Sequence, residues 1–359
     1  MSQALSETSQ GFGGTRMLGS FLAASFIGVF FLWLAARGLP LADVRDYLAS
    51  ADYGRLGLAS AAFVLLYIVC HGARVWRWNY LVRPLGEVST QQVNRACALG
   101  FTAIVLMPLR LGEFVRPMVL ARSSGLPASG LLATAVVERV MDGLIITALL
   151  FAALWTYQGQ APVAFARGAG LLSLMIFLPA IVMCVVAYTR RRWAEVIVEQ
   201  TLGRISQKLA AAVSGLLMGF VEGFKSLVDG RNLGRFLGAT ALYWGTNALS
   251  MWALLSIGFD LGLNPWEIAT VMAVLVIGIM VPAGPAMAGN FEFFMTRGMG
   301  LFVDMDVATL AAQVAVFAVL VHVLQLLVIV VPGAWVMARA PGLWRRDVPA
   351  HSGRQGAPD

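Results

Sequence analysis

The sequence predicts an all-α protein, a polytopic membrane helix bundle with about six full spans and two oppositely oriented re-entrant hairpins. Of its 359 residues 59% are hydrophobic and 13% are charged, and the mean hydropathy is +0.77. An ordinary soluble domain has about 45–50% apolar and about 25% charged residues, so polar surface is too scarce here to cover a globule. Long apolar runs also alternate with short basic segments, as in multi-spanning membrane proteins. The composition therefore argues against a soluble enzyme.

The long apolar runs define the predicted full spans. The first, residues 18–36, is long enough to cross a hydrocarbon core of about 30 Å. A cleaved signal sequence is the alternative, because Leu34-Ala35-Ala36 is similar to a cleavage site. The second run, residues 56–71, is expected to end at the headgroup level, where arginines and tryptophans follow His71. Further full spans are expected at residues 131–155, 170–188, 236–259 and 308–337.

Two other apolar runs, residues 96–107 and 268–281, are too short to span comfortably, and each is followed by a proline. Short segments interrupted by Gly and Pro in both halves of a chain are typical of transporter binding sites. An internal match pairs the two breaks, because the spacing Pro-x3-Gly-x-Phe occurs at residues 108–114 and again at 285–291. The predicted backbone breaks are Pro108, Gly112, Pro282, Pro285 and Gly289.

Basic residues indicate the orientation. Residues 190–235 carry eight Lys and Arg whereas 259–267 carry none, so the first segment is placed in the cytoplasm and the second outside. The arginines of residues 74–95 and those after residue 338 are assigned to the cytoplasm in the same way. Residues 91–122 then enter the membrane from the cytoplasm and residues 264–306 from outside, as an inverted repeat, and both termini are cytoplasmic.

The expected domains are an N-terminal cytoplasmic segment (1–16), a transmembrane domain (17–339) and a disordered cytoplasmic tail (340–359). Within the second, residues 193–228 repeat apolar side chains every three or four residues, which predicts an amphipathic cytoplasmic helix or, with equal weight, a plain connector. The three cysteines lie in or beside apolar runs and are interpreted as buried apolar residues: Cys70, Cys97 and Cys184.

The charges indicate which partners to expect. The net charge is +7, and the charged residues lie between apolar segments instead of forming one stripe. This pattern favours membrane lipids over nucleic acid as the partner. The three histidines are too scattered to predict a metal site, and no cofactor is expected. A homo-oligomer is compatible with the sequence.

Charged side chains at membrane depth are the candidate headgroup-binding residues, because their burial is costly unless they face a cavity or a partner. They form three groups: Arg110, Glu113 and Arg116 after the first break; Glu138, Arg139 and Asp142, with the two acids on one helix face; and Glu292, with Arg297, after the second break. Guanidinium groups suit a lipid phosphate, and the carboxylates would balance them, accept a cationic headgroup or carry a coupling proton.

A structural interpretation competes with this functional one. Glu113 and Glu138 could instead form ion pairs with Arg116 or Arg139 that hold the bundle together. His322 and Gln325 are interpreted as interhelical hydrogen-bond partners. Asn247, Trp244 and Trp252 are interpreted as packing and interface residues.

The motif residues also carry a family resemblance. Pro108-x-Arg110-x-Gly112-Glu113-x-x-Arg116, then Glu138-Arg139-Val-x-Asp142 and the loop at 282–292 resemble the lysylphosphatidylglycerol synthase transmembrane-region family of flippase-like proteins, over about residues 18–338. The resemblance implies a multi-spanning fold with re-entrant elements, and lipid translocation or trafficking in the cytoplasmic membrane. Some relatives carry a soluble aminoacyl-transferase domain; none follows here, so no aminoacyl transfer is expected. The loop at 285–289 departs from the family's glycine-rich form.

Together these observations predict a non-enzymatic flippase or transporter that moves a polar or isoprenoid-linked lipid across or out of the inner membrane. The alternative is an integral-membrane transferase with Glu138 or Asp142 as a base. No Asp-Asp-x-x-Asp cluster that would hold a metal and a diphosphate supports it. An ion channel or small-solute carrier would need polar rings along a pore, whereas the apolar segments carry isolated charges.

Overall fold

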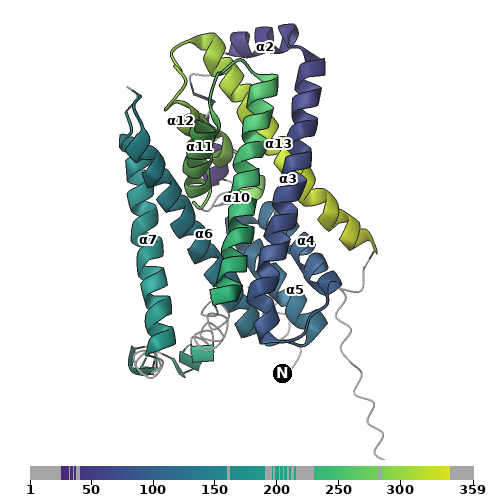
Figure 1. Ribbon diagram of the computed structural model, residues 1–359, viewed down its shortest axis with the longest axis vertical. Helices are drawn as coiled ribbons and strands as arrows, with labels where there is room; N and C mark the ends of the chain where they lie inside the picture. Colours follow the sequence, from purple (N-terminus) through teal and green to yellow (C-terminus); the bar gives the residue numbers. More distant parts are fainter. Residues whose placement is uncertain are drawn as a thin grey trace, which may run out of the picture.

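The computed structural model describes residues 41–159, 162–190, 230–281 and 284–339, most of 26–37 and scattered positions between 196 and 215 (Figure 1). Every regular element in these ranges is a helix, which confirms the all-α prediction. Three helices among them are long and apolar enough to cross a membrane: Tyr53–Leu85, Ala164–Met183 and Ala308–Arg339. The number of six spans stays a prediction. The segments 1–16 and 340–359, most of 193–228, Pro282 and the Cys184 side chain lie outside the described residues.

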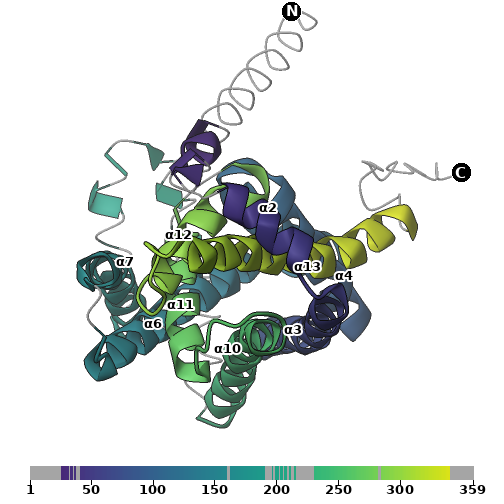
Figure 2. The same cartoon turned by 90° about the horizontal axis from the view of Figure 1, so that it is seen from above.

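Two long helices, α3 (Tyr53–Val82) and α10 (Gly230–Gly258), pack side by side along the bundle (Figures 1 and 2). At the upper end in Figure 1, the Arg55 guanidinium joins them, because it donates to the carbonyl of Ile257 (2.5 Å) and to Asp260 (2.8 Å). This hydrogen bond and the charge of Arg55 lower the pKa of Asp260.

Helix α3 corrects one expectation. The prediction of a helix end between His71 and Trp78 was wrong, because the helix continues to Val82 and carries Arg74 and Arg77 within it. A single helical glycine such as Gly72 costs only about 1 kcal/mol relative to alanine. The last turns bury Trp78, Leu81 and Val82 completely, and this packing offsets that cost. Arg74 and Arg77 therefore lie within α3.

The first hairpin consists of α4 (Thr90–Leu106), the 3₁₀ helix η2 (Pro108–Phe114) and α5 (Val115–Ser124), in the lower half of Figure 1. A capping box of Ser89 and Gln92 begins α4. Two glycines allow the chain to approach itself closely: a Cβ on Gly100 would meet Arg116, and one on Gly112 would meet the backbone of α4. The break after Leu106 thus turns the chain back along α4.

The second hairpin consists of α11 (Pro265–Gly278), η3 (Pro285–Met287) and α12 (Asn290–Met299), in the upper half of Figure 1. Asn264 and Glu267 form the capping box of α11, and a Cβ on Gly278 would meet the ring of Phe294 on α12. The second hairpin therefore repeats the first in its order of elements and in its close crossing at a glycine.

The two breaks also share a backbone conformation. Arg110 and Met287 each stand two residues after the proline that begins the 3₁₀ helix, and their φ angles are 58° and 57°. Ala286 has φ 59°. Non-glycine residues are uncommon in this left-handed region, and such strain persists only where the surrounding structure holds it. The repeat that the sequence suggests is therefore also a repeat of local geometry.

The remaining helices enclose the hairpins. α6 (Ala128–Thr156) and α7 (Ala164–Thr189) lie side by side at the left of Figure 1, and α13 (Ala308–Arg339) crosses the bundle. α2 (Leu41–Ser50) lies across the upper end against α13 (Figure 2). Cys70 and Cys97 are buried in the apolar core, as predicted.

Candidate functional site

A network of buried charges joins α3 and α6. Arg77 of α3 is fully buried, and its Nη1 lies 2.5 Å from Oδ1 of Asp142. Its Nη2 donates to Oε1 of Glu138 at 2.6 Å and to Oδ2 of Asp142 at 2.7 Å. One guanidinium therefore binds both acids, which confirms that Glu138 and Asp142 share one face of α6.

The same network reaches α5 and α10. Arg116 donates to Oε2 of Glu138 at 2.5 Å, and its guanidinium lies 4.3 Å from the ring centroid of Trp78. The indole nitrogen of Trp244 on α10 donates to Oδ1 of Asp142 at 3.2 Å. Both oxygens of Glu138 thus accept from arginines, and the pairing of Glu138 with Arg116 agrees with the structural interpretation.

Arg110 and Glu113 form a separate pair at the first break. Arg110 Nε donates to Oε1 of Glu113 at 2.8 Å, and its Nη1 donates to the carbonyl of Ile279 just after α11, also at 2.8 Å. Glu113 therefore pairs with Arg110 and not with Arg116. Arg139 has only longer contacts, at 3.7 to 3.9 Å, with Glu138, Asp142 and Glu113.

The third predicted group holds the second hairpin to α13. His322 Nδ1 lies 2.6 Å from Oε1 of Glu292, its Nε2 lies 2.8 Å from the carbonyl oxygen of Ala286, and its ring stacks on Phe291. The backbone N–H of Gly289 donates to the other oxygen of Glu292 at 2.7 Å. The prediction of His322 as an interhelical hydrogen-bond partner is confirmed. Arg297 lies elsewhere, with its guanidinium 5.2 Å from the ring centroid of Phe293.

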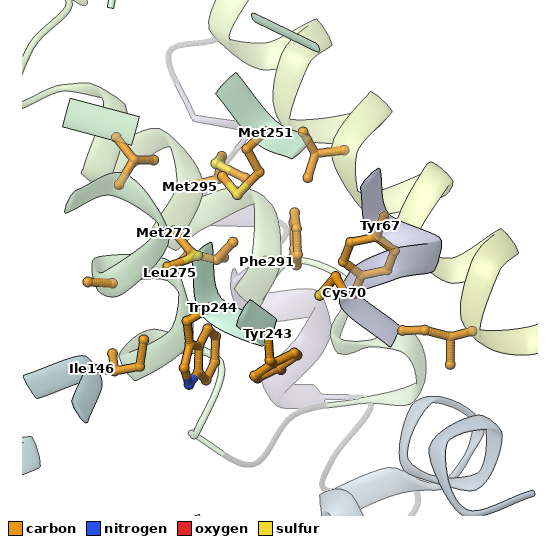
Figure 3. Packing of buried hydrophobic residues seen from close by; sticks show 14 of the residues in the cluster. Tyr67, Cys70, Ile146, Tyr243, Trp244, Met251, Met272, Leu275, Phe291 and Met295 are labelled. Carbon is orange, nitrogen blue, oxygen red and sulfur yellow. The ribbon is translucent and has the colours of Figure 1, made fainter. Parts of the chain in front are cut away.

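An enclosed cavity of about 100 Å³, here called the central cavity, lies between both hairpins and α3, α6, α10 and α13. Figure 3 shows part of its wall, where Tyr67, Tyr243, Trp244 and Phe291 converge from α3, α10 and α12. Of the predicted site residues, Arg110, Arg139 and Asp142 line it. Arg74 and the amide side chains Asn247 and Gln325 also line it.

A second space, here called the lateral pocket, lies between α6, α7 and the end of α11 and has a volume of about 390 Å³. Its wall is mostly apolar, and two of its α7 residues, Leu172 and Ile176, are each 56% exposed. Arg110 and Arg139 line both this pocket and the central cavity. The two arginines therefore stand between an enclosed charged space and an apolar space that opens outward.

Sequence reasoning missed three residues of this site. Arg74 and Arg77 were assigned to the cytoplasmic side of a helix end and Trp244 to packing, although no proline interrupts the helix before Pro84. Continuation of the helix to that proline would have placed both arginines on α3, three residues apart and so on one face. Within the described residues, no group of three or more His, Cys, Asp and Glu side chains could hold a metal ion.

Comparisons with known proteins give one match. The family described as "Lysylphosphatidylglycerol synthase TM region" matches residues 21–333. The matched range includes every charged residue of the site and both hairpins. No curated protein and no solved structure matches the chain.

Proposed function

Because the chain belongs to the lysylphosphatidylglycerol synthase TM region family, we propose that it is a flippase or transporter that moves a polar or isoprenoid-linked lipid. Membership makes it a membrane protein linked to lipid metabolism or transport, with membrane lipids around it. The proposed movement is across or out of the inner membrane, with both termini cytoplasmic.

The observation that carries the proposal is the position of Arg110 and Arg139 between two unlike spaces. A lipid has a polar headgroup and apolar chains, and it needs a polar space beside an apolar one. The central cavity offers arginines and amides, while the lateral pocket offers Leu172, Ile176 and Phe177. A headgroup in the first space can therefore stay attached to chains in the second.

The charged residues divide between two roles in this proposal. Arg110, Arg139 and Asp142 line the central cavity and would contact the headgroup. Arg77, Arg116 and Glu138 bind one another more closely and would hold the cavity wall in place. Glu113 orients Arg110, and Glu292 holds the second hairpin through His322. The cost of moving a headgroup through hydrocarbon falls because these groups replace its water contacts.

The test is lipid translocation in proteoliposomes that contain the purified full chain and a labelled lipid in one leaflet. We expect Arg139→Gln to slow translocation about tenfold or more, because a charge-assisted hydrogen bond to a headgroup is worth about 1.5–3 kcal/mol. Arg95→Gln is the matched control, since Arg95 is an exposed arginine of α4. Equal rates for the wild type and Arg139→Gln would remove Arg139 from the site.

The proposal contains no chemical step, so the protein would not be an enzyme. The oxygens of Glu138 and Asp142, the acids that a transferase would use as a base, accept hydrogen bonds from Arg77, Arg116 or Trp244. Proton abstraction by either acid would require breaking these contacts. Covalent product formed by the purified protein from a lipid-linked substrate and a donor would replace the proposal with a transferase.

A further inference from the structure

The charges in and around the central cavity do not balance. Five arginines and three carboxylates form this group: Arg74, Arg77, Arg110, Arg116, Arg139, Glu113, Glu138 and Asp142. In the described part of the chain, the remaining acid nearby, Glu292, contacts His322 and not an arginine. Two positive charges are therefore in excess, in a segment where an uncompensated charge is expensive.

The excess can be assigned to two side chains. Arg77, Arg110 and Arg116 each have a carboxylate oxygen within 2.7 Å. Arg139 reaches only carboxylates that another arginine binds more closely, at 3.7 Å or more. Arg74 forms no ion pair with any residue that the structure describes.

The surroundings of Arg74 leave its guanidinium available. Its Cζ lies 4.0 Å from the ring centroid of Phe101, and its buried Nε has no hydrogen-bond partner among the described residues. An aromatic face stabilises a cation without neutralising it. Arg74 and Arg139 both line the central cavity, so the two excess charges face the same space.

We propose that the central cavity binds a phosphate group with two negative charges, a phosphomonoester or a diphosphate, through Arg74 and Arg139. The proposal rests on the lipid-transport function proposed above and names the charge of its headgroup. A dianion neutralises the excess, and a guanidinium presents paired donors that match phosphate oxygens. The cavity volume of about 100 Å³ is far below the roughly 300–1,000 Å³ of pockets for drug-sized ligands. It therefore suits one small charged group and not a whole lipid.

The test measures lipid binding to the full chain in nanodiscs of phosphatidylcholine. Three labelled lipids are compared: phosphatidic acid, which is a phosphomonoester; phosphatidylglycerol, a diester with one negative charge; and zwitterionic phosphatidylcholine. We expect phosphatidic acid to bind about tenfold or more tightly than the other two. Arg74→Gln should abolish this preference, whereas the exposed control Arg95→Gln should keep it. Equal binding of the three lipids, or an unchanged preference in Arg74→Gln, overturns the inference.

A second set of measurements distinguishes binding of free inorganic phosphate from binding and transport of a lipid phosphate. If millimolar inorganic phosphate displaces phosphatidic acid and no lipid is translocated, the phosphate site stands and the proposed lipid transport is wrong. If lipids are translocated without regard to headgroup charge and Arg74→Gln has no effect, transport stands and the phosphate site is wrong. The two proposals can therefore fail independently.

Thermal unfolding without added lipid checks that Arg74 has no structural partner. We expect Arg74→Gln to unfold at a higher temperature than the wild type, because the change removes an uncompensated charge. Arg77→Gln should unfold at a lower temperature, because Asp142 loses its close arginine and Glu138 loses one of its two. A lower unfolding temperature for Arg74→Gln would mean that Arg74 is paired and would overturn the assignment.

Discussion

At the scale of single residues, the arginines of this protein differ in the groups that they bind. Arg77 is fully buried with two acids bound, and Arg116 lies between Glu138 and the Trp78 ring. Arg110 is tied to Glu113 and to a carbonyl of the other hairpin. Arg77 and Arg116 hold the wall in place, whereas Arg110, Arg139 and Arg74 line the central cavity, and the last two have only longer ion pairs or none with the described residues.

The first prediction concerns Arg77, an arginine that binds buried carboxylates. Arg77→Gln should lower the free energy of unfolding in mild detergent by about 3–5 kcal/mol, because removing one partner of a buried pair leaves an uncompensated charge. Denaturant titration followed by tryptophan fluorescence measures this change. Arg95→Gln should shift stability by less than about 0.5 kcal/mol. A stability of Arg77→Gln equal to that of the wild type would show that the network does not support the fold.

The contact between Glu292 and His322 contains one hydrogen more than a neutral imidazole and a carboxylate would have together. Nε2 of His322 faces the Ala286 carbonyl, which only accepts, so this nitrogen carries a hydrogen. Nδ1 faces a carboxylate oxygen of Glu292 at 2.6 Å, so a hydrogen also lies between those two atoms. The pair is therefore either imidazolium with carboxylate or imidazole with carboxylic acid, and each form holds the same extra proton.

The second prediction uses this proton count. In Glu292→Gln the amide can donate to Nδ1 and accept from the Gly289 N–H, so stability should change by less than about 1 kcal/mol. In Glu292→Ala both groups lose their partner, and the loss should be about 1–3 kcal/mol. Comparison of the two variants by thermal unfolding measures the difference. Equal losses would argue against this assignment of hydrogens.

At the scale of elements, the two hairpins are built alike. Each has a helix, a break that starts at a proline, a 3₁₀ turn with a left-handed residue, and a ten-residue helix. Each also crosses closely at a glycine, Gly100 and Gly112 in the first and Gly278 in the second. Close crossing places the two breaks beside the central cavity, where Arg110 and Met287 both line its wall.

The third prediction tests the close crossing. Gly112→Ala should destabilise the protein by about 1–3 kcal/mol, because its Cβ would meet the backbone of Ala103 and Ile104 and would push η2 away from α4. Gly72→Ala is the matched control, because a Cβ at this helical position meets no atom within 4 Å. It should stabilise α3 by about 0.5–1 kcal/mol. Equal unfolding temperatures for the two variants would contradict the packing argument.

At the scale of the whole molecule, the hairpins lie at opposite ends of one bundle (Figure 1). The first lies in the lower half beside α3, and the second in the upper half. Their breaks meet near the middle, where Arg110 donates to the carbonyl of Ile279. This arrangement agrees with an inverted repeat in which the cavity lies between two half-helices from opposite sides.

The fourth prediction is topological. In a variant without native cysteines, Ser123→Cys places a thiol in the last turn of the first hairpin, and Asp306→Cys places one after the second hairpin, both at exposed positions. An impermeant maleimide should label the first from the cytoplasmic side and the second from the outside. The labelling of each thiol is measured in vesicles of both orientations, and the two results are compared. Labelling of both thiols from one side would refute the opposite orientation of the hairpins.

The sequence by itself determined that the chain is helical, that it belongs in a membrane, and where most helices lie. These properties are local, because hydropathy, run length and the positions of Pro and Gly act over a few residues. The helix end expected between His71 and Trp78 was wrong. An apolar run can stop before its helix does, and α3 continues to Val82.

Only the tertiary structure decided which charges pair and which stay free. Arg77 is separated from Glu138 by 61 positions and from Asp142 by 65, and Arg116 from Glu138 by 22. The Coulomb energy of a pair depends on its distance in space and on burial, and neither can be read from spacing along the chain. For the same reason the sequence does not single out Arg74, which lies in no motif. The structure identifies it as unpaired among the described residues, because neighbouring arginines bind the nearby carboxylates.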